Sequence, residues 1–206
     1  MLIEWLGHSC FRISDQGYAL VLDPYKPNMI PGLGPYQTEA NQVLCSHEHA
    51  DHNYRQVVNI IKNDARKSFG LSFIETFHDD EKGHKRGSNR ITIIQTDTLR
   101  IAHFGDLGCE LTESQYDALT DIDCVMIPVG GFYTIDAKTA KMICDRIKPK
   151  MIIPMHFKGD GFGPAVIDTV ESFTKLYDKK QIRKYSTNHV DISEKTDFHI
   201  ALLKLK

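Results

Sequence analysis

Four side chains able to bind a metal ion fall within six residues, in the run His47-x-His49-x-Asp51-His52. Neutral imidazole and carboxylate are ligands that zinc and similar divalent cations prefer. Residues 43–45 read as a short buried strand ending just before the run, and strand side chains two positions apart point the same way. His47 and His49 are therefore expected to reach one ion, with Asp51 and His52 displaced toward a second position. The structural alternative, a solvated histidine-rich turn, accounts poorly for four ligating groups in six residues.

Three further candidate ligands, His78, Asp106 and His156, each follow the end of an expected strand. Functional side chains collect in loops held by a rigid scaffold. Singly each is weak evidence, because a lone histidine is more often structural and Asp106 could be a turn aspartate bonded to its own backbone. His103, in the strand leading to Asp106, competes with His78 as the third histidine. Together the set offers the additional ligands that a centre with two ions needs.

The elements that must position these residues are mostly strands in the first half of the chain and alternate with helices in the second. We expect strands at residues 2–6, 10–14, 19–22, 43–45, 71–77, 90–95, 99–104, 123–127, 150–155 and 198–205. We expect helices at residues 54–63, from about 112 onward, at 136–147 and at 164–177, with a long loop over 25–36. This order predicts layered sheets flanked by helices, an α/β (α+β) fold in a single domain spanning residues 1–206.

Composition narrows the class of protein. The chain has 206 residues, 41% of them hydrophobic and 25% charged, and a formal net charge of -2, which gives no basic footprint for nucleic acid. Its one basic cluster, Lys82 with His84, Lys85 and Arg86, is explained equally well by a solvated loop. We expect no membrane span and no signal peptide. Five cysteines, an odd number mostly inside apolar segments, predict reduced thiols in a cytoplasmic protein.

The sequence resembles the metallo-β-lactamase superfamily, and in particular its small cytoplasmic branch related to L-ascorbate-6-phosphate lactonase. The matching segments are WLGHS at 5–9, SHEHADH at 46–52, HD at 78–79, RIAHFGD at 100–106, IPVGG at 127–131 and IPMH at 153–156. The resemblance spans nearly the whole chain. It implies a four-layer αβ/βα sandwich, two facing sheets covered by helices, with the metals at one edge.

The resemblance also implies how the ligands are shared. The first ion would be held by His47, His49 and His78, and the second by Asp51, His52 and His156, with Asp106 bridging the two. His78 is preferred over His103, whose side chain is expected to point into the core. We expect two divalent cations, zinc first, with manganese or iron as the alternatives.

Two such ions can share a water, lower its pKa and present hydroxide to a carbonyl or phosphoryl centre. Asp51 is expected to orient that hydroxide and to pass a proton to the leaving group. The substrate-facing candidates are weaker, and ordinary structural roles explain each of them as well. They are His8 after the first strand, Gly131 as a close backbone approach, Tyr133 as a hydrogen-bond donor, and Lys158 as a partner for a phosphate or carboxylate.

The function that these residues predict is metal-dependent hydrolysis of a small anionic metabolite, with a lactone or a phosphate ester as leading candidates. The expected partner is a small-molecule substrate, without nucleic acid or membrane, and a homo-oligomer is possible. A phosphodiesterase or nuclease would use the same metals but should carry a basic surface. An iron-dependent oxidoreductase would carry extra domains or a glutamate in place of His49. A non-catalytic metal-binding protein would have lost ligands.

Overall fold

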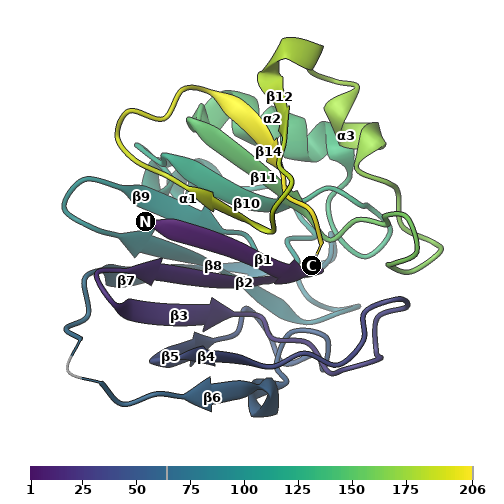
Figure 1. The fold of residues 1–206 in the computed structure, drawn as a ribbon. Coiled ribbons are helices and arrows are strands. Elements are labelled where there is room, and N and C mark those ends of the chain that lie inside the picture. The colour runs from purple at the N-terminus through teal and green to yellow at the C-terminus, as the bar shows by residue number, and fades with distance from the viewer. Residues whose placement is uncertain (64, 206) are drawn as a thin grey trace.

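A computed structural model describes residues 1–63 and 65–205. Two β-sheets face each other in it, with helices beside the larger one (Figure 1). The strands of the smaller sheet are β1 (Leu2–Gly7), β2 (Cys10–Asp15), β3 (Tyr18–Leu22), β5 (Gln42–Leu44) and β13 (His189–Asp191). Those of the larger sheet are β7 (Gly70–Phe77), β8 (Ser88–Gln95), β9 (Arg100–His103), β10 (Cys124–Pro128), β11 (Met151–Met155), β12 (Ile182–Lys184) and β14 (His199–Leu202). The mixed α/β fold is confirmed.

Pairing within the sheets follows the chain. The smaller sheet has the order β13-β1-β2-β3-β5, antiparallel except where β5 joins β3 in parallel. The larger sheet has the order β12-β14-β11-β10-β9-β8-β7. Its strands from β12 to β9 are parallel, and β8 and β7 continue as antiparallel neighbours. β8 and β9 form a hairpin that turns at Thr96, between the two strands that the sequence predicts there. The short strands β12 and β13 were not predicted.

The core lies between the two sheets. Alternate residues of the smaller sheet, such as Phe11, Leu20 and Leu22, share one buried cluster with Ile91 and Ile101 of the larger sheet. Side chains alternate between the two faces of a strand, which explains why Leu20 and Leu22 of β3 both point into this core. Burying this apolar surface is the main force that holds the sheets together.

The other face of the smaller sheet is covered by irregular chain. Ala19 and Val21, which alternate with the core residues of β3, pack in a second buried cluster with Ile30, Leu33 and Val57. Ile30 and Leu33 belong to the loop over residues 25–36, which the sequence predicts correctly as a loop. This loop thus occupies a place where a layered α/β fold commonly has a helix.

The helix expected at residues 54–63 is wrong. The chain instead forms a short 3₁₀ turn, η1 (Arg55–Val57), and the strand β6 (Val58–Ile60), which pairs in parallel with β4 (Thr38–Ala40). Val57 and Val58 are buried, whereas Ile60 is exposed, so apolar spacing alone misled the prediction. β-branched residues lose side-chain freedom in a helix and fit a strand well, and a free partner strand decided the outcome.

α-Helices occur, within the described residues, only from Glu113 onward. Helix α1 (Glu113–Ala118) begins at Thr112 with a capping box completed by Gln115. Helix α2 (Ala137–Ile147) matches its predicted range and packs against β10. Helix α3 (Glu171–Thr174) contacts α2 and is followed by a second 3₁₀ turn, η2 (Lys179–Gln181).

The long helix expected over residues 164–177 is also wrong, because only α3 is helical. Residues before it pair with other loops: Asp168 N donates to Gly130 O, and Lys158 N donates to Asp168 O. These tertiary hydrogen bonds replace the helical ones and draw the segment toward the ends of β10 and β11. No helix in the described part of the chain is long and apolar enough to cross a membrane.

Candidate metal centre

The seven predicted ligands meet at one edge of the sandwich, just past the ends of β5, β7, β9 and β11. The bridging candidate Asp106 is buried, and its Oδ2 lies 3.1 Å from Nε2 of His52, 3.3 Å from Nε2 of His78 and 3.2 Å from Nε2 of His156. One carboxylate oxygen thus faces three imidazoles that come from different loops. These strand ends converge because β7, β9 and β11 run in the same direction within the larger sheet and therefore end at one edge, where β5 of the facing sheet also ends.

Two groups of ligands can be separated by geometry. One ligand atom each of His47, His49 and His78 lies within 4.8 Å of the others, and so do those of Asp51, His52 and Asp106. His156 reaches the second group through its contact with Asp106. The structure therefore brings the predicted ligands together. His52 also groups with His47 and Asp23, and with His8 and His156, so the division into two sets stays a prediction. His49 is the exposed member, so the first set opens toward solvent.

The run from His47 to His52 reaches the centre as a turn. β5 ends at Leu44, and the backbone N–H groups of His52 and Asn53 both donate to the carbonyl of His49. His47 and His49 therefore lie in a turn and not, as the sequence wrongly predicts, in a strand, although their two side chains do converge. This turn folds the run back on itself and so places Asp51 and His52 in the second set of ligands.

His103, the competing third histidine, lies in the core. Its Nε2–H donates to the carbonyl of Ser9 at 2.8 Å, and its Nδ1 accepts from the N–H of Gly105. Both ring nitrogens are therefore used within the fold. This leaves His78 as the histidine that completes the first set.

Sequence reasoning missed Asp23, a fully buried carboxylate at the end of β3. Its Oδ2 accepts from Nδ1–H of His52 at 2.8 Å, and its two oxygens also accept from the backbone and hydroxyl of Ser46. The Ser46 hydroxyl in turn lies 2.9 Å from Nδ1 of His47. A carboxylate behind a ligating histidine fixes the tautomer and turns Nε2 toward the metal. The available signal was an aspartate directly after a buried strand.

The donor set fits divalent cations. Nε2 of His8 and of His47, and Nδ1 of His78 and of His156, are buried and have no hydrogen-bond partner among the described residues. Buried polar atoms are otherwise nearly always paired, so several orphaned imidazole nitrogens in one place indicate a missing positive partner. Nitrogen-rich ligands with two or three carboxylate oxygens suit zinc and related metals.

The electrostatics of the centre favour the ligating forms of His47 and Asp106. Burial, followed by the neighbouring His52, lowers the pKa of His47 to about 3, which keeps its ring neutral and able to bind a cation. Burial alone would raise the pKa of Asp106, but His156 and His52 hold it well below its usual value. Asp106 is therefore an anion surrounded by imidazoles, which is the arrangement that a bridging ligand requires.

The backbone is strained at this edge. His8, Asp23 and His156 have φ values of 51°, 49° and 51°, in the left-handed region that residues other than glycine seldom adopt. Each such residue costs of order 1 kcal/mol and persists only where the surroundings determine it. All three lie in or directly behind the proposed centre, so the fold tolerates this strain where functional side chains must be aimed.

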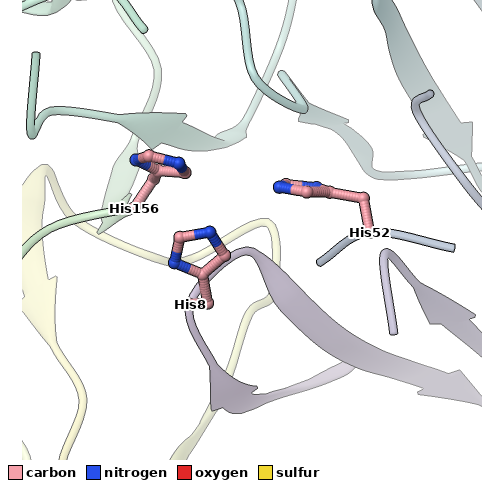
Figure 2. Close-up of side chains that lie close together, drawn as sticks. All are labelled: His8, His52 and His156. Atoms are coloured by element: carbon pink, nitrogen blue, oxygen red, sulfur yellow. The ribbon is translucent and has the colours of Figure 1, made fainter. Parts of the chain in front are cut away.

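His8 stands beside the second set of ligands, as Figure 2 shows for His8, His52 and His156. Its ring centroid lies 4.2 Å from that of His156, and its Nε2 lies 3.8 Å from Oδ2 of Asp51. The structure therefore places His8 at the candidate metal centre, and its substrate-facing role stays a prediction.

A cavity of about 460 Å³ opens over the centre. Its lining includes the ligands His49, Asp51, His78, Asp106 and His156, together with His8, Met29, Ile30, Ala50, Arg86, Tyr133 and Pro164. Tyr133 thus lies where a substrate would meet the metals. Arg86, interpreted from sequence as part of a solvated loop, lines the same cavity. The basic cluster in the sequence was a signal for Arg86, but it was ambiguous, because a solvated loop and a ligand-binding site can carry the same cluster.

Two substrate-facing predictions differ from the structure. Lys158 lies in another cavity, beside Trp5 and Phe162, and its Nζ donates to the carbonyl of Ala165 at 3.1 Å. It is not among the residues that line the metal cavity. Gly131 is outside the lining of the metal cavity; its φ of 64° shapes the turn that presents Tyr133.

The chain is similar to known metal-dependent hydrolases. It is 25% identical over 209 residues to a UPF0173 metal-dependent hydrolase from Lawsonia intracellularis, covering 83% of this chain and 88% of that one. It is likewise 25% identical over 195 residues to a UPF0173 metal-dependent hydrolase from Pyrobaculum neutrophilum, covering 76% and 84%. A crystal structure from Thermotoga maritima, described as a zinc-dependent hydrolase of the metallo-β-lactamase superfamily, matches with a TM-score of 0.78 and 29% identity, covering 100% and 99%.

A family model described as a β-lactamase superfamily domain matches residues 2–156. That range is three quarters of the chain and contains the whole candidate centre, from His8 to His156. The relation to L-ascorbate-6-phosphate lactonase stays a prediction. The sequence motifs, the facing sheets and the ligand cluster agree with the family match, and the chain belongs to the metallo-β-lactamase superfamily of metal-dependent hydrolases.

Proposed function

We propose that the protein hydrolyses a lactone or phosphate ester bond in a small anionic metabolite, using two divalent cations. The residues that would hold them are His47, His49 and His78 for one cation, Asp51, His52 and His156 for the other, and Asp106 between them. The observation that carries this proposal is Oδ2 of Asp106, within 3.3 Å of imidazoles from both sets. A carboxylate in that position can contribute to both cation sites.

When bound, such cations lower the pKa of a water and polarise the bond under attack. The side chains of the protein supply the rest. Asp51 lies on the cavity wall and stays partly exposed, so its carboxylate can accept a proton from the attacking water and return it to the leaving oxygen. Tyr133 can donate its hydroxyl hydrogen to a substrate oxygen. His8, which lines the same cavity, would restrict how the substrate fits against Asp51.

Zinc is the first choice of metal, with manganese or iron as alternatives. Five of the seven ligands are imidazoles, which suit zinc and iron better than magnesium or calcium. The cavity volume of about 460 Å³ is typical of small-molecule sites and small for a polymer. Together with the net charge of -2, this volume favours a metabolite over nucleic acid as the substrate.

We also propose a cytoplasmic location for the single domain. All five cysteines are free, and Cys10, Cys124 and Cys144 are buried, as expected of a protein made in a reducing compartment. Association into a homo-oligomer is compatible with this proposal. Size-exclusion chromatography with light scattering would measure the oligomeric state directly.

The test combines metal content with activity. The purified protein is loaded with zinc or manganese, its metal content is measured by mass spectrometry, and it is assayed on panels of lactones, phosphate monoesters, phosphodiesters and thioesters. We expect about two ions per chain and hydrolysis of a lactone or phosphate ester. His47→Ala should lose a metal ion, and Asp51→Ala should lose activity by about a hundredfold or more.

His189→Ala provides the matched control, because His189 is exposed on β13 and away from the centre. It should leave both metal content and activity unchanged. Activity that survives His47→Ala or Asp51→Ala would contradict the two-metal mechanism. A metal content near zero after loading would remove the centre altogether, and hydrolysis confined to phosphodiesters would favour the nuclease alternative.

A further inference from the structure

Arg86 places a positive charge on the wall of the metal cavity. Its guanidinium lies 5.6 Å from the centroid of the Tyr133 ring and donates one hydrogen bond, at 3.3 Å, to the carbonyl of Phe132. Within the described residues, no carboxylate lies within the 4.0 Å that would pair it as a salt bridge. A guanidinium has five N–H donors in a planar fork, so most of its donors remain available to a ligand.

The backbone of Arg86 is held firmly in place. The carboxylate of Asp79, itself buried, accepts from the backbone N–H groups of Glu81, Gly83, Lys85 and Arg86. The loop is closed at its base, where the N–H of His78 donates to the carbonyl of Gly87. One end of the loop is therefore the metal ligand His78, and the other end carries Arg86. The position of the charge relative to the metals is fixed by the loop and costs little to organise when a ligand binds.

Tyr133 supports the guanidinium from a second loop. The turn after β10 places its ring against Arg86 and its neighbour Phe132 under the guanidinium N–H. An aromatic face beside a guanidinium stabilises the cation without neutralising it, which a carboxylate partner would do. The positive charge of Arg86 is therefore not neutralised by Tyr133. The planar guanidinium fork matches the two oxygens of a carboxylate or phosphate.

We propose that Arg86, supported by Tyr133, forms an anion subsite that binds a carboxylate or phosphate on the substrate at a distance from the bond that is cleaved. This inference rests on the proposed function and adds a substrate class to it: bifunctional molecules with a hydrolysable group at one end and an anion at the other. The cleaved bond must lie against Asp106 and its imidazoles, whereas Arg86 lies on the wall of the cavity. The anion bound there is therefore a second group of the same molecule.

Three p-nitrophenyl esters test the subsite in the zinc-loaded protein. The esters of glutarate and 4-phosphonobutyrate carry a remote carboxylate and a remote phosphonate, and the ester of monomethyl glutarate is the neutral match. We expect kcat/KM to be about 10- to 100-fold higher for a charged ester than for the neutral one, the range of a charge-assisted hydrogen bond. The larger preference of the two identifies the natural anion as a carboxylate or a phosphate.

Arg86→Met should abolish this preference by raising KM for the charged ester much more than KM for the neutral ester. Arg86→Lys should keep part of it, because lysine retains the charge without the fork. Lys85→Met is the matched control, since Lys85 is on the same loop but is exposed and paired with Asp80 and Glu81. It removes the same charge and should leave the preference intact.

Equilibrium binding separates failure of the subsite from failure of the proposed function. Glutarate and 4-phosphonobutyrate are titrated calorimetrically into the same zinc-loaded samples, whose metal contents are measured. Arg86→Met should raise the Kd of one of them about tenfold or more, even if the wild-type protein cleaves no ester. Equal Kd values in the wild type and Arg86→Met would overturn the subsite. So would a variant that loses activity equally on charged and neutral esters.

Discussion

At the scale of single residues, the candidate centre depends on side chains that hydrogen-bond to the proposed ligands. Asp23 accepts the Nδ1–H of His52 and holds Ser46, which in turn contacts His47. One buried carboxylate thereby orients two ligands of different sets. Its negative charge is also one of the causes that raise the pKa of His52 well above its usual value despite burial, with Asp106 the larger of the two.

We predict that Asp23→Asn weakens metal binding by about 10- to 100-fold, with the loss concentrated in the second cation. Asparagine keeps the shape but can present an NH₂ group where His52 needs an acceptor, so the ring tautomer is no longer fixed. Competition with a zinc-sensitive dye measures the affinities. Asp97→Asn, in the exposed turn of the β8–β9 hairpin, is the control, and equal affinities in both variants would contradict the role of Asp23.

The sequence could predict the ligands better than their supports. His47, His49, Asp51 and His52 are adjacent in the chain, so their types and spacing identify them without a structure. Asp23 carries no such pattern, because its partner lies 29 residues away and meets it only once β3 and β5 have paired in parallel. Lys158 failed for the opposite reason: closeness to His156 in sequence says nothing about which way the chain turns.

At the scale of elements, the centre requires loops to pack without side chains between them. Gly108 follows β9, and a Cβ atom built there would overlap the backbone of His78. The loops that follow β7 and β9 are therefore in direct backbone contact. This contact sets how far His78 stands from Asp106, two residues before the glycine.

We predict that Gly108→Ala separates these loops, lowering the free energy of unfolding by about 1–3 kcal/mol and weakening metal binding as well. Gly34→Ala is the matched control, because a Cβ there meets nothing within 4 Å and the glycine has no positive φ. Urea unfolding and metal titration measure the two effects. Two variants that behave alike would show that the close approach is not required.

Elements were predictable where local pattern and tertiary pairing agree. Helix α2 has an aspartate cap at Asp136 and an amphipathic pattern, and it forms as expected. Residues 54–63 and 164–169 have apolar spacing that suits a helix, yet β4 pairs with β6, and Asp168 bonds to Gly130. A partner that is distant in sequence leaves no local signal, so these two segments could not be read from the chain alone.

At the scale of the whole molecule, the cluster of buried imidazoles should lower the free energy of unfolding when no cation is bound. Chelation should therefore lower the Tm, and adding zinc should restore it. When free zinc is a hundredfold above its Kd, binding should raise the free energy of unfolding by about 2.7 kcal/mol. Differential scanning fluorimetry with and without chelator makes the measurement. His47→Ala should reduce the zinc-dependent shift, whereas His189→Ala should preserve it. An unchanged Tm would contradict this expectation.

Alkaline pH should destabilise the molecule as a whole. Burial raises the pKa values of the thiols of Cys10, Cys124 and Cys144 and of the hydroxyls of Tyr25 and Tyr177. In the unfolded chain these groups lose protons near pH 8.5 for a thiol and about pH 10 for a phenol. The folded protein then binds more protons than the unfolded chain, so the free energy of unfolding must fall as pH rises above about 9.

Urea unfolding between about pH 7.5 and pH 10 measures this slope. Cys124→Ala removes one such group, so its free energy of unfolding should fall less steeply with pH, even though the cavity makes the variant less stable at neutral pH. A flat profile above about pH 9 in the wild-type protein would contradict the prediction.

The loop that covers the outer face of the smaller sheet has a consequence for how this protein can evolve. Ile30 packs in the second buried cluster and also lines the metal cavity, next to the half-exposed Met29. A lineage that adapts to a new substrate by changing this loop thus alters its own core with the same substitution. Substitutions that change substrate binding are therefore limited by the need to keep the core packed. They are least limited at Met29, which lines the cavity but is not part of the buried cluster.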